Sequence, residues 1–463
     1  MNLKLAKSKV HFIGVGGIGM SGLAELLHNM GAQVSGSDLG ANANTYRLQE
    51  MGVEIFKGHD AANIGEAEVV VYSSAITPKN CEFSQAKETR IPLIPRAEAL
   101  SEIMRLKRGI VVAGTHGKTT TTSIISSIFL QAKKDPTIAV GGRLESIGSN
   151  AKLGKGEWMI AESDESDGSF LMLYPEISVI TNIDNDHVDY YGDFLSLKKA
   201  FYKFACNIPF YGSLVCCGDD PMIRDLMAPF SKKIIYYGLN ANNDYQLKQL
   251  EPFENCEYEV YCEEEKYCSL KIPLPGRHNA LNSLAALIAS TEAGIDLETA
   301  TQGIENFNGV GRRFEYKDEV DGVIFYDDYG HHPTEIKAVF NSFRDRYPGR
   351  RLVVFFEPHR YTRMKDCWEE FIKELKEPDL VFVTRIYEAS ETPIPGVTAE
   401  AIVASVPKAQ LLDMNTKWEG EKLNPYFQQI QDEIQSNDIC VTLGAGKINV
   451  IGEKLIEYLK DHA

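Results

Sequence analysis

Short apolar runs alternate with longer amphipathic stretches over most of the chain. Between residues 9 and 106 the apolar runs are VHFIGV, QVSGSD and VVVYSSAI, and the stretch from Met20 to Met30 has helical periodicity. Short strands that alternate with helices predict βαβ units, which build parallel sheets with right-handed crossovers. The segment IPRAEALSEIMRLKRG then predicts a closing helix and a linker.

Two further series of the same kind follow. The second contains GIVVAG, a predicted helix from Thr119 to about Gln131, EWMIAES and ISVITNID, then an expected antiparallel flap between Glu251 and Lys271 and a buried helix from Asn279 to Glu292. The third contains GVIFYDD, RLVVFFE, DLVFVTR, AQLLD and DICVTLG. After Pro333, apolar residues at helical spacing predict a face packed on a sheet; they are Ile336, Val339, Phe340 and Phe343.

The breaks between the series predict three α/β domains, since 463 residues exceed one ordinary core. We expect a Rossmann-like N-terminal domain at 1–108, a central P-loop-type ATPase domain with a mostly parallel sheet at 109–308, and a C-terminal Rossmann-like α/β domain at 309–463.

Composition narrows the functional class. Hydrophobic residues make up 44% and charged residues 24%, as in a globular enzyme, and the net charge of −17 disfavours nucleic-acid and anionic-membrane partners. No apolar run has the length of a membrane span, so we expect a cytoplasmic protein, a monomer or weak homo-oligomer. The spacing of Cys256, Cys262 and Cys268 matches no zinc pattern and predicts reduced strand positions.

The first of two glycine loops is GVGGIG, between a predicted strand and a helix. Glycines allow a tight turn, and the N–H groups and partial positive charge of a helix start favour a pyrophosphate. Asp38 ends the next strand, where an acid would meet a ribose hydroxyl. A turn that only packs helix on strand is the alternative. The candidate residues are Gly14, Gly16, Gly17, Ile18, Gly19 and Asp38.

The second loop is GTHGKTTTT. It departs from a full P-loop, because Val112 stands where the first glycine belongs. Lys118 can still reach the β- and γ-phosphates of a nucleotide, and Thr119 can ligate Mg²⁺. A glycine–lysine turn without a ligand is the alternative. The candidate phosphate-binding residues are Gly114, Thr115, His116, Gly117, Lys118, Thr119 and Thr120.

A divalent metal needs further ligands. Glu162 ends the strand EWMIAES, and His187 follows the strand ISVITNID. The carboxyl ends of these strands and of GIVVAG can converge on one triphosphate. The alternative for His187 is a capping or core histidine. The alternative for the acidic run from Glu162 to Asp167 is a solvated loop.

Eight ordered motifs resemble the Mur ligases over nearly the whole chain. They are GVGGIGMSGLAE, GTHGKTTTT, AESDESDGSF, NIDNDHVDYYGDF, GRHNALN, GVGRRFE, DDYGHHPTEI and EPHRYTR. The resemblance implies that the first loop holds the diphosphate of a UDP-sugar and the second the triphosphate of ATP. It thereby accounts for two phosphate-binding loops in one chain.

The resemblance also implies the reaction and its residues. L-Alanine would be joined to the lactyl carboxylate of UDP-N-acetylmuramate through an acyl phosphate, giving ADP and phosphate. ATP and Mg²⁺ or Mn²⁺ would be required, with Thr119, Glu162 and His187 as metal ligands. Lys118, His187, His331 and Arg313 would be catalytic, while Asn279, Arg313 and Asp328 would contact ATP. The alternative for Arg313 is a buried arginine that is paired with a structural acid.

The amino-acid site is expected near two motifs of the third domain. Arg360 and Arg363 are three residues apart, so they could face one carboxylate. Pro333 predicts the first turn of a helix, whose positive end would keep a nearby histidine neutral. By resemblance, Tyr329 and His331 lie in this site, and His331 is a candidate general base, with substrate positioning as the alternative.

Three rival functions remain open at this point. A recycling ligase would attach a tripeptide to the same UDP-sugar; a Rossmann dehydrogenase would use only the first loop; a nucleotide-gated binding module would bind ATP without forming product. One departure from the family pattern is LGAGKI, where Lys447 replaces the acid of GAGDI.

Overall fold

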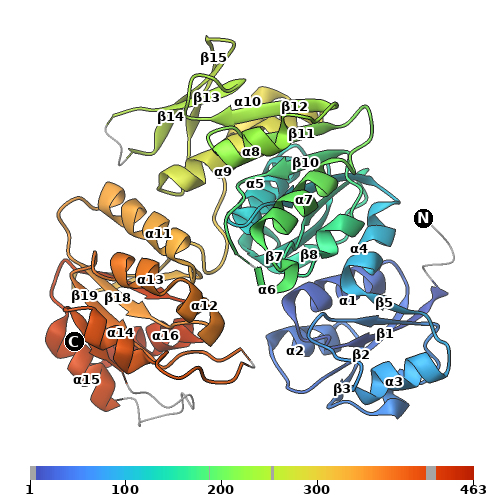
Figure 1. Cartoon of the computed structure of the whole chain (residues 1–463), viewed down its shortest axis with the longest axis horizontal. Helices are drawn as coiled ribbons and strands as arrows, with labels where there is room; N and C mark the ends of the chain where they lie inside the picture. Colours follow the sequence, from blue (N-terminus) through green and yellow to red (C-terminus); the bar gives the residue numbers. More distant parts are fainter. Residues whose placement is uncertain (1–6, 187, 252–254, 390, 413–423, 463) are drawn as a thin grey trace. The chain divides into compact units, whose positions relative to one another are not determined.

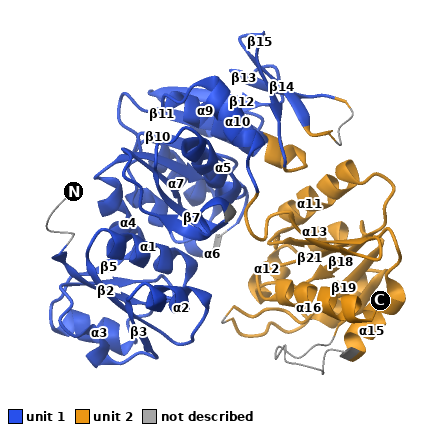
Figure 2. Cartoon of the chain, turned by 180° about the vertical axis from the view of Figure 1, so that it is seen from behind, with its two compact units in different colours: residues 1–250, 257–273, 281–308 blue, residues 251–256, 274–280, 309–463 orange. Residues whose placement is uncertain are grey.

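The structure is a computed structural model that describes residues 7–186, 188–251, 255–389, 391–412 and 424–462 (Figure 1). The chain divides into two compact units (Figure 2). Unit 1 comprises residues 1–250, 257–273 and 281–308, and unit 2 comprises residues 251–256, 274–280 and 309–463. Within the described residues the strands form sheets of five, ten and six strands.

The N-terminal sheet of unit 1 is parallel throughout, with the order β3-β2-β1-β4-β5. Its strands are β1 (Lys9–Ile13), β2 (Gln33–Asp38), β3 (Glu54–Lys57), β4 (Val69–Tyr72) and β5 (Leu93–Pro95). Its helices are α1 (Ile18–Asn29), α2 (Ala43–Glu50), α3 (Cys81–Glu88) and α4 (Arg96–Met104). This order places the loop after β1 at the centre of the sheet, where strand order reverses and ligands bind in such folds.

The second sheet of unit 1 has a parallel centre, β12-β11-β10-β6-β9-β7. These strands are β6 (Arg108–Ala113), β7 (Thr137–Leu144), β9 (Trp158–Glu162), β10 (Ile177–Ile180), β11 (Ser213–Cys217) and β12 (Lys233–Gly238), and β8 (Ser149–Lys152) pairs antiparallel with β7. The helices are α5 (Lys118–Gln131), α6 (Val188–Tyr191), α7 (Phe194–Ala205), α8 (Pro221–Met227), α9 (Arg277–Glu292) and α10 (Leu297–Glu305); residues 277–280 of α9 belong to unit 2.

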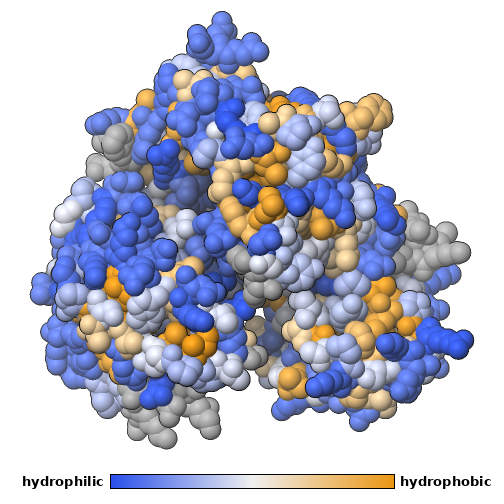
Figure 3. All heavy atoms as spheres, in the orientation of Figure 1, coloured by the Kyte–Doolittle hydropathy of each residue, from blue (hydrophilic) through white to orange (hydrophobic). Residues whose placement is uncertain are grey.

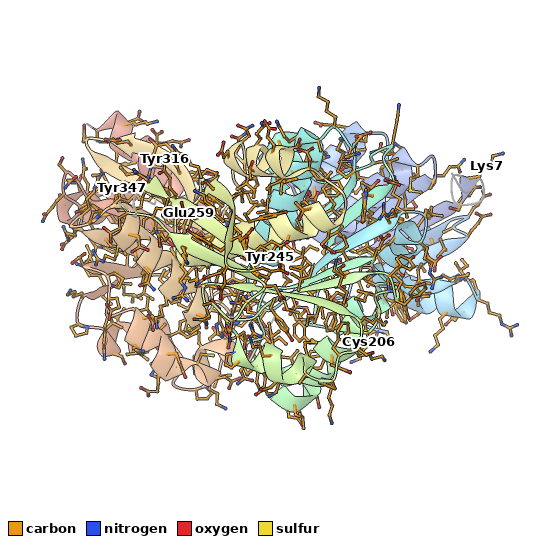
Figure 4. The ribbon with its side chains drawn as sticks, turned by 90° about the horizontal axis from the view of Figure 1, so that it is seen from above. Lys7, Cys206, Tyr245, Glu259, Tyr316 and Tyr347 are labelled. Carbon is orange, nitrogen blue, oxygen red and sulfur yellow. The ribbon has the colours of Figure 1, made fainter. Side chains whose placement is uncertain are left out.

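The predicted antiparallel flap extends the other edge of this sheet. It consists of β13 (Tyr245–Gln249), β14 (Glu257–Cys262) and β15 (Glu265–Lys271). Tyr245 and Glu259, labelled in Figure 4, lie on the neighbouring strands β13 and β14. The flap prediction is confirmed, but Cys256 precedes β14 and so does not occupy the strand position that its spacing predicted.

Unit 2 contains the third sheet, with the order β16-β17-β21-β18-β19-β20. Its strands are β16 (Glu315–Val320), β17 (Val323–Asp328), β18 (Leu352–Phe356), β19 (Leu380–Val383), β20 (Ala409–Leu411) and β21 (Ile439–Leu443), of which β16 is antiparallel to β17. Its helices are α11 (Pro333–Arg346), α12 (Tyr361–Asp366), α13 (Trp368–Glu374), α14 (Ala399–Ser405), α15 (Asn424–Glu433) and α16 (Ile448–Asp461).

Helices cover both faces of the third sheet. On one face the predicted apolar side of α11 packs with α13 and α14 against alternate strand residues, and on the other α15 and α16 do so. Pro333 is the first residue of α11, as predicted, and His332 caps the helix. Burial of both faces explains why these strands read as near-continuous apolar runs.

The surface agrees with the composition. On the face shown in Figure 3, hydrophobic side chains form scattered groups among mostly hydrophilic ones. No helix in the described part of the chain is long and apolar enough to cross a bilayer.

Candidate active site

The first glycine loop connects β1 to α1. Gly14 has a φ of +81°, which favours glycine, and its N–H donates to the carbonyl of Ser37 at 2.9 Å. The Gly16 N–H donates to Oδ2 of Asp38 at 2.8 Å. Sequence reasoning placed Asp38 beside a ribose hydroxyl, but in the structure this carboxylate oxygen accepts a hydrogen bond from the loop itself. A contact of Asp38 with the sugar nucleotide stays a prediction.

The second loop connects β6 to α5 and is a tight turn built on Gly114 and Gly117. Their φ angles are +135° and +81°, and a Cβ on Gly117 would lie 2.6 Å from Oδ1 of Asn282. Val112, which replaces the expected P-loop glycine, lies inside β6. Lys118 folds back over the turn, donating from Nζ to the carbonyls of Gly114 at 2.6 Å and Thr115 at 3.0 Å.

Lys118 also forms a buried ion pair that sequence reasoning missed. Its Nζ lies 2.8 Å from Oε1 of Glu165, a residue only 1% exposed. Burial raises the pKa of the Glu165 carboxyl to about 7. The Tyr191 hydroxyl donates to the backbone carbonyl of Glu165. The alternative that residues 162–167 form a solvated loop is therefore wrong at Glu165.

Thr119 and Glu162 lie together, as the metal hypothesis requires. The Thr119 hydroxyl donates to Oε1 of Glu162 at 2.9 Å, and the Gly141 N–H donates to Oε2 at 2.6 Å. A hydroxyl and a carboxylate are the hard oxygen ligands that Mg²⁺ prefers, so this pair fits such an ion. The third expected ligand, His187, lies outside the described residues.

The strand ends that were expected to converge do so. β6 lies between β9 and β10 in the sheet, so the loops that follow these three strands are neighbours. The His116 N–H donates to Oδ1 of Asn182 at 2.9 Å, and its Nε2 lies 3.1 Å from Oδ2 of Asp184. The Thr115 hydroxyl accepts from the Asp184 N–H at 2.9 Å. The turn between β6 and α5 is thus held against the loop after β10.

One cavity of about 310 Å³ in unit 1 brings the two glycine loops together. It is lined by the first loop and the start of α1, by the ends of β4 and β9, and by Lys118 at the start of α5. Residues predicted for different ligands, Gly17 to Gly19 for the sugar nucleotide and Lys118 and Glu162 for ATP and metal, therefore face the same space. Arg96 and Asn150 also line it and carried no motif.

In unit 2, the two arginines of GVGRRFE have different environments. Arg312 takes the structural role, with Nε 3.1 Å from Oδ2 of Asp327 and further bonds to the carbonyls of Gly444 and Gly446. The Arg313 guanidinium lies 4.9 Å from the centre of the Tyr329 ring. Arg312 therefore has a structural role, while both the catalytic role of Arg313 and its structural alternative stay predictions.

Asp328 joins two loops of the candidate site. Its Oδ2 accepts from the Phe314 N–H and its Oδ1 from the Gly330 N–H, both at 2.7 Å. Burial raises the pKa of the Asp328 carboxyl to about 6. Both oxygens thus accept hydrogen bonds from the backbone, and the expected contact with ATP stays a prediction. The expected adenine contact, Asn279, is buried in unit 2 and donates from Nδ2 to the Pro275 carbonyl at 2.8 Å.

His331 is neutral, as predicted, but chiefly for another reason. Burial lowers the pKa of its imidazole to about 4 and outweighs the nearby Glu335, which raises it. Nδ1 lies 3.0 Å from the Tyr329 carbonyl and 3.4 Å from Oε2 of Glu335. Because both neighbours are acceptors, Nδ1 carries the proton and Nε2 keeps its lone pair. The Tyr329 and His331 rings are 5.2 Å apart.

Arg360 and Arg363 have partners in the structure that sequence reasoning did not find. Nε of Arg360 lies 2.6 Å from Oε1 of Glu391, and Nη1 of Arg363 lies 3.3 Å from Nδ1 of His359. The His359 ring stacks on Tyr387, with centroids 5.3 Å apart, and lies 5.5 Å from His331. Shared recognition of one carboxylate by the two arginines stays a prediction, with Glu391 as a competing anion.

The LGAGKI segment is a turn from β21 into α16. Lys447 precedes the first residue of α16, and Oε2 of the buried Glu357 accepts from the Ile448 N–H at 3.3 Å. Burial raises the pKa of the Glu357 carboxyl to about 7. A carboxylate at a helix N-terminus is favourably placed. The acid expected from the family pattern is absent here, but another acid, Glu357, which follows β18, faces this turn.

The fold and the two glycine loops, each between a strand and a helix, are those of a nucleotide-dependent α/β enzyme. Family models match residues 9–108 (Mur ligase family, catalytic domain), 112–290 (Mur ligase middle domain) and 312–446 (Mur ligase, glutamate ligase domain). The chain belongs to the Mur ligase family, which confirms the resemblance seen in the motifs.

Curated relatives and solved structures agree. The chain is 50% identical to the UDP-N-acetylmuramate–L-alanine ligase of Bdellovibrio bacteriovorus, covering 99% of this chain and 100% of the relative, and 46% identical to that of Geotalea daltonii, covering 98% of each. A UDP-N-acetylmuramate-alanine ligase from Thermotoga maritima superposes with a TM-score of 0.82 at 27% identity, over 98% and 100% of the chains. A murein peptide ligase from Psychrobacter arcticus, at 22% identity and a TM-score of 0.74 over 98% of each chain, shares the fold.

Proposed function

We propose that this protein joins L-alanine to the lactyl carboxylate of UDP-N-acetylmuramate, using ATP and releasing UDP-N-acetylmuramoyl-L-alanine, ADP and phosphate. The observation that carries the proposal is the single cavity shared by the two glycine loops. A sugar nucleotide on the first loop would extend its muramoyl group toward Lys118, where the γ-phosphate of ATP is expected. The curated relatives named for this activity, at 46–50% identity over nearly the full chain, support the same reaction.

Amide formation in water needs an activated carboxylate. The lactyl carboxylate attacks the γ-phosphate of ATP and displaces ADP. The deprotonated amine of L-alanine then attacks the resulting acyl phosphate and displaces phosphate. Two anions meet in the first step, so cations must neutralise them. Lys118 supplies one charge. Thr119 and Glu162, with the expected ligand His187, would hold Mg²⁺ or Mn²⁺, which supplies further positive charge at the phosphates.

The amino-acid end of the reaction belongs to unit 2. Arg360 and Arg363 would bind the carboxylate of L-alanine, and Tyr329 and His331 would face its amine. The lone pair on Nε2 of His331 points to an acceptor role, whereas a pKa of about 4 makes the imidazole a weak base. The ammonium group of a free amino acid is less acidic than a peptide N-terminus, whose pKa is about 8, so it would lose its proton to that imidazole only with difficulty. We therefore favour the positioning role of His331 over general-base catalysis.

The test is ATP-dependent phosphate release by the purified protein with Mg²⁺ and UDP-N-acetylmuramate. Three acceptor conditions are compared: L-alanine, L-Ala-D-Glu-diaminopimelate and none. We expect release only with L-alanine, together with a product of the matching mass. Release only with the tripeptide would move the protein to the recycling reaction, and no release with any acceptor would contradict a ligase function. Because both nucleotides are made and used in the cytoplasm, we place the reaction there.

A further inference from the structure

The cavity between the two glycine loops is lined by a cation for which no motif gave a role. Arg96 is the first residue of α4 and follows Pro95, the helix cap. Its guanidinium packs against the start of α1 so closely that a Cβ on Gly19 would lie 3.1 Å from Nη1. Gly19 therefore leaves space for this side chain beside the first loop. Among the residues described around the cavity, Arg96 and Lys118 are the cations.

Both cations are paired with consecutive residues of one acidic loop. Nη2 of Arg96 lies 3.7 Å from Oδ2 of Asp164, and Nζ of Lys118 lies 2.8 Å from Oε1 of Glu165. The first pair is partly exposed, with side-chain exposures of 24% for Arg96 and 45% for Asp164. The second pair is buried. Lys118 is the proposed phosphate-binding residue of the second loop. Because Arg96 is paired with an acid of the same loop, as Lys118 is, Arg96 would also bind an anionic group of a ligand.

A cation beside the first loop would strengthen the binding of a diphosphate. Its Gly16 N–H already donates to Asp38, which leaves a negative charge beside the loop. The remaining N–H groups and the N-terminus of the 12-residue helix α1 offer only partial positive charge. A guanidinium adds a full charge and a planar pair of donors that match two phosphate oxygens.

We propose that Arg96 binds the diphosphate of the sugar nucleotide, and that Asp164 occupies its place in the ligand-free protein. The inference rests on the proposed function, because it takes the sugar nucleotide as the ligand of the first loop. Binding would exchange the long Arg96–Asp164 pair for a contact with the diphosphate, while Oδ1 of Asp164 keeps its hydrogen bond from the Ser166 N–H at 3.0 Å. Arg96 thereby becomes a substrate-binding residue contributed by α4 rather than by either glycine loop.

Calorimetric titration without ATP tests the proposal with two ligands. UDP-N-acetylmuramate and UDP-N-acetylglucosamine share the diphosphate, but only the first carries a lactyl carboxylate. For Arg96→Ala we expect Kd to rise about 10- to 100-fold for both ligands, the range for a lost charge-assisted hydrogen bond. Arg96→Lys should recover part of the loss. Asp164→Asn should lower Kd, by up to about fivefold, because the pair it breaks is partly exposed.

Arg105→Ala is the matched control. Arg105 follows the same helix, pairs with Glu102 at 2.7 Å and lies outside this cavity, so its loss should leave both affinities unchanged. The Kd for ATP and the thermal midpoint of each variant show whether the fold is intact. Unchanged affinity of folded Arg96→Ala for both ligands would overturn the inference. A loss confined to UDP-N-acetylmuramate would also overturn it, since the contact would then be to the carboxylate.

The outcomes also separate this inference from the proposed function. If the wild-type protein binds neither sugar nucleotide, the proposed function fails and the inference fails with it. If the wild-type protein binds and ligates, while Arg96→Ala binds equally well, only the inference fails.

Discussion

The carboxylate of Glu165 lies beside Lys118, at the position proposed for a phosphate of ATP. Its Oε1 lies 2.8 Å from Nζ, inside the protein, where the γ- and β-phosphates of ATP would otherwise meet that lysine. Burial raises the pKa of Glu165 to about 7, which reflects the cost of keeping this carboxylate charged away from water. If Lys118 binds the phosphates of ATP as proposed, ATP must break this buried ion pair.

The first prediction concerns Glu165→Gln. Lys118 would lose its partner, so the ligand-free protein should unfold at a lower temperature, because an unpaired buried charge is destabilising. ATP would no longer compete with the carboxylate, so its Kd should fall several-fold and the ATP-induced rise in thermal midpoint should grow. Calorimetry and thermal denaturation with and without ATP measure both quantities.

Asp167→Asn is the control for this variant, since Asp167 belongs to the same loop and its Oδ1 accepts from the Ser169 N–H at 3.0 Å. It should change ATP affinity little. Weaker ATP binding by Glu165→Gln would show that Glu165 positions Lys118 for the nucleotide instead of competing with it.

The second prediction concerns His331. With a pKa of about 4, its imidazole stays neutral across the ordinary pH range, so it should contribute no titration near pH 6.5 to kcat/KM. A positioning residue should be replaceable in part by a neutral side chain that keeps a hydrogen bond. His331→Gln should therefore retain more activity than His331→Ala. In both variants, KM for L-alanine should change more than kcat.

Steady-state kinetics at saturating ATP and UDP-N-acetylmuramate provide the measurement. Loss of turnover in both variants with normal L-alanine affinity would instead establish His331 as the general base. Unchanged turnover and KM in His331→Ala would remove it from the site.

At the scale of elements, the turn from β6 into α5 depends on its glycines. Our third prediction is that Gly117→Ala weakens ATP binding about tenfold or more, equivalent to about 1.4 kcal/mol. The substitution places a Cβ 2.6 Å from Oδ1 of Asn282 at a φ of +81°, so the turn is strained and the Asn282 side chain must move. Gly294→Ala is the control, because its φ is +90° with nothing within 4 Å of the added Cβ. Equal ATP affinity in the two variants would contradict the role of the turn.

The fourth prediction concerns the acid stability of the loops in unit 2. Burial lowers the pKa of His278 and His331 to about 4 and that of His359 to about 3. The folded protein keeps these imidazoles neutral, whereas the unfolded chain takes up protons below about pH 6.5. Their contribution to stability is therefore complete above pH 6.5 and is lost as the pH falls toward 4.

The measurement is the free energy of unfolding between pH 7 and pH 4.5. Each histidine should account for on the order of 1 kcal/mol of the decrease. His359→Gln should make the decrease shallower, while His462→Gln, at the exposed C-terminal end, should leave it unchanged. A parallel decrease in His359→Gln and wild type would contradict the assignment.

Much of this architecture follows from the sequence pattern, because strands buried on both faces leave near-continuous apolar runs. The strands of the third sheet that follow parallel βαβ patterns, such as LVVFF in β18, were predicted in the right places. The glycine loops, Lys118 and the neighbouring Thr119 and Glu162 were also found, since their chemistry is tied to local spacing.

What the sequence did not disclose depends on contacts between distant elements. Glu165 looked like one acid in a solvated run until β9 placed it against Lys118. Arg96 looked like the start of an ordinary helix until α4 packed on Gly19. Glu391 carried no motif, yet it pairs with Arg360 over 31 positions in the chain. Burial and pairing of this kind have no local signature.

At the scale of the whole molecule, the predicted residues divide between the two units. Lys118, Thr119 and Glu162 belong to unit 1, while Arg313, Tyr329, His331 and both arginines of PHRYTR belong to unit 2. One reaction needs groups of both sets, and an acyl phosphate must be protected from water. The proposed function therefore requires that nucleotide binding favour a conformation in which the two sets act on the same substrates.

The fifth prediction is a ligand-dependent change in solution scattering. Addition of ATP, Mg²⁺ and UDP-N-acetylmuramate should reduce the radius of gyration, because binding energy is available only to the conformation that contacts both substrates. Lys118→Ala is the matched variant, since it removes a phosphate contact in unit 1 and leaves unit 2 intact; at the same ligand concentrations it should show a smaller reduction. Identical wild-type profiles with and without both nucleotides would mean that residues of the two units reach the substrates without any rearrangement that scattering detects.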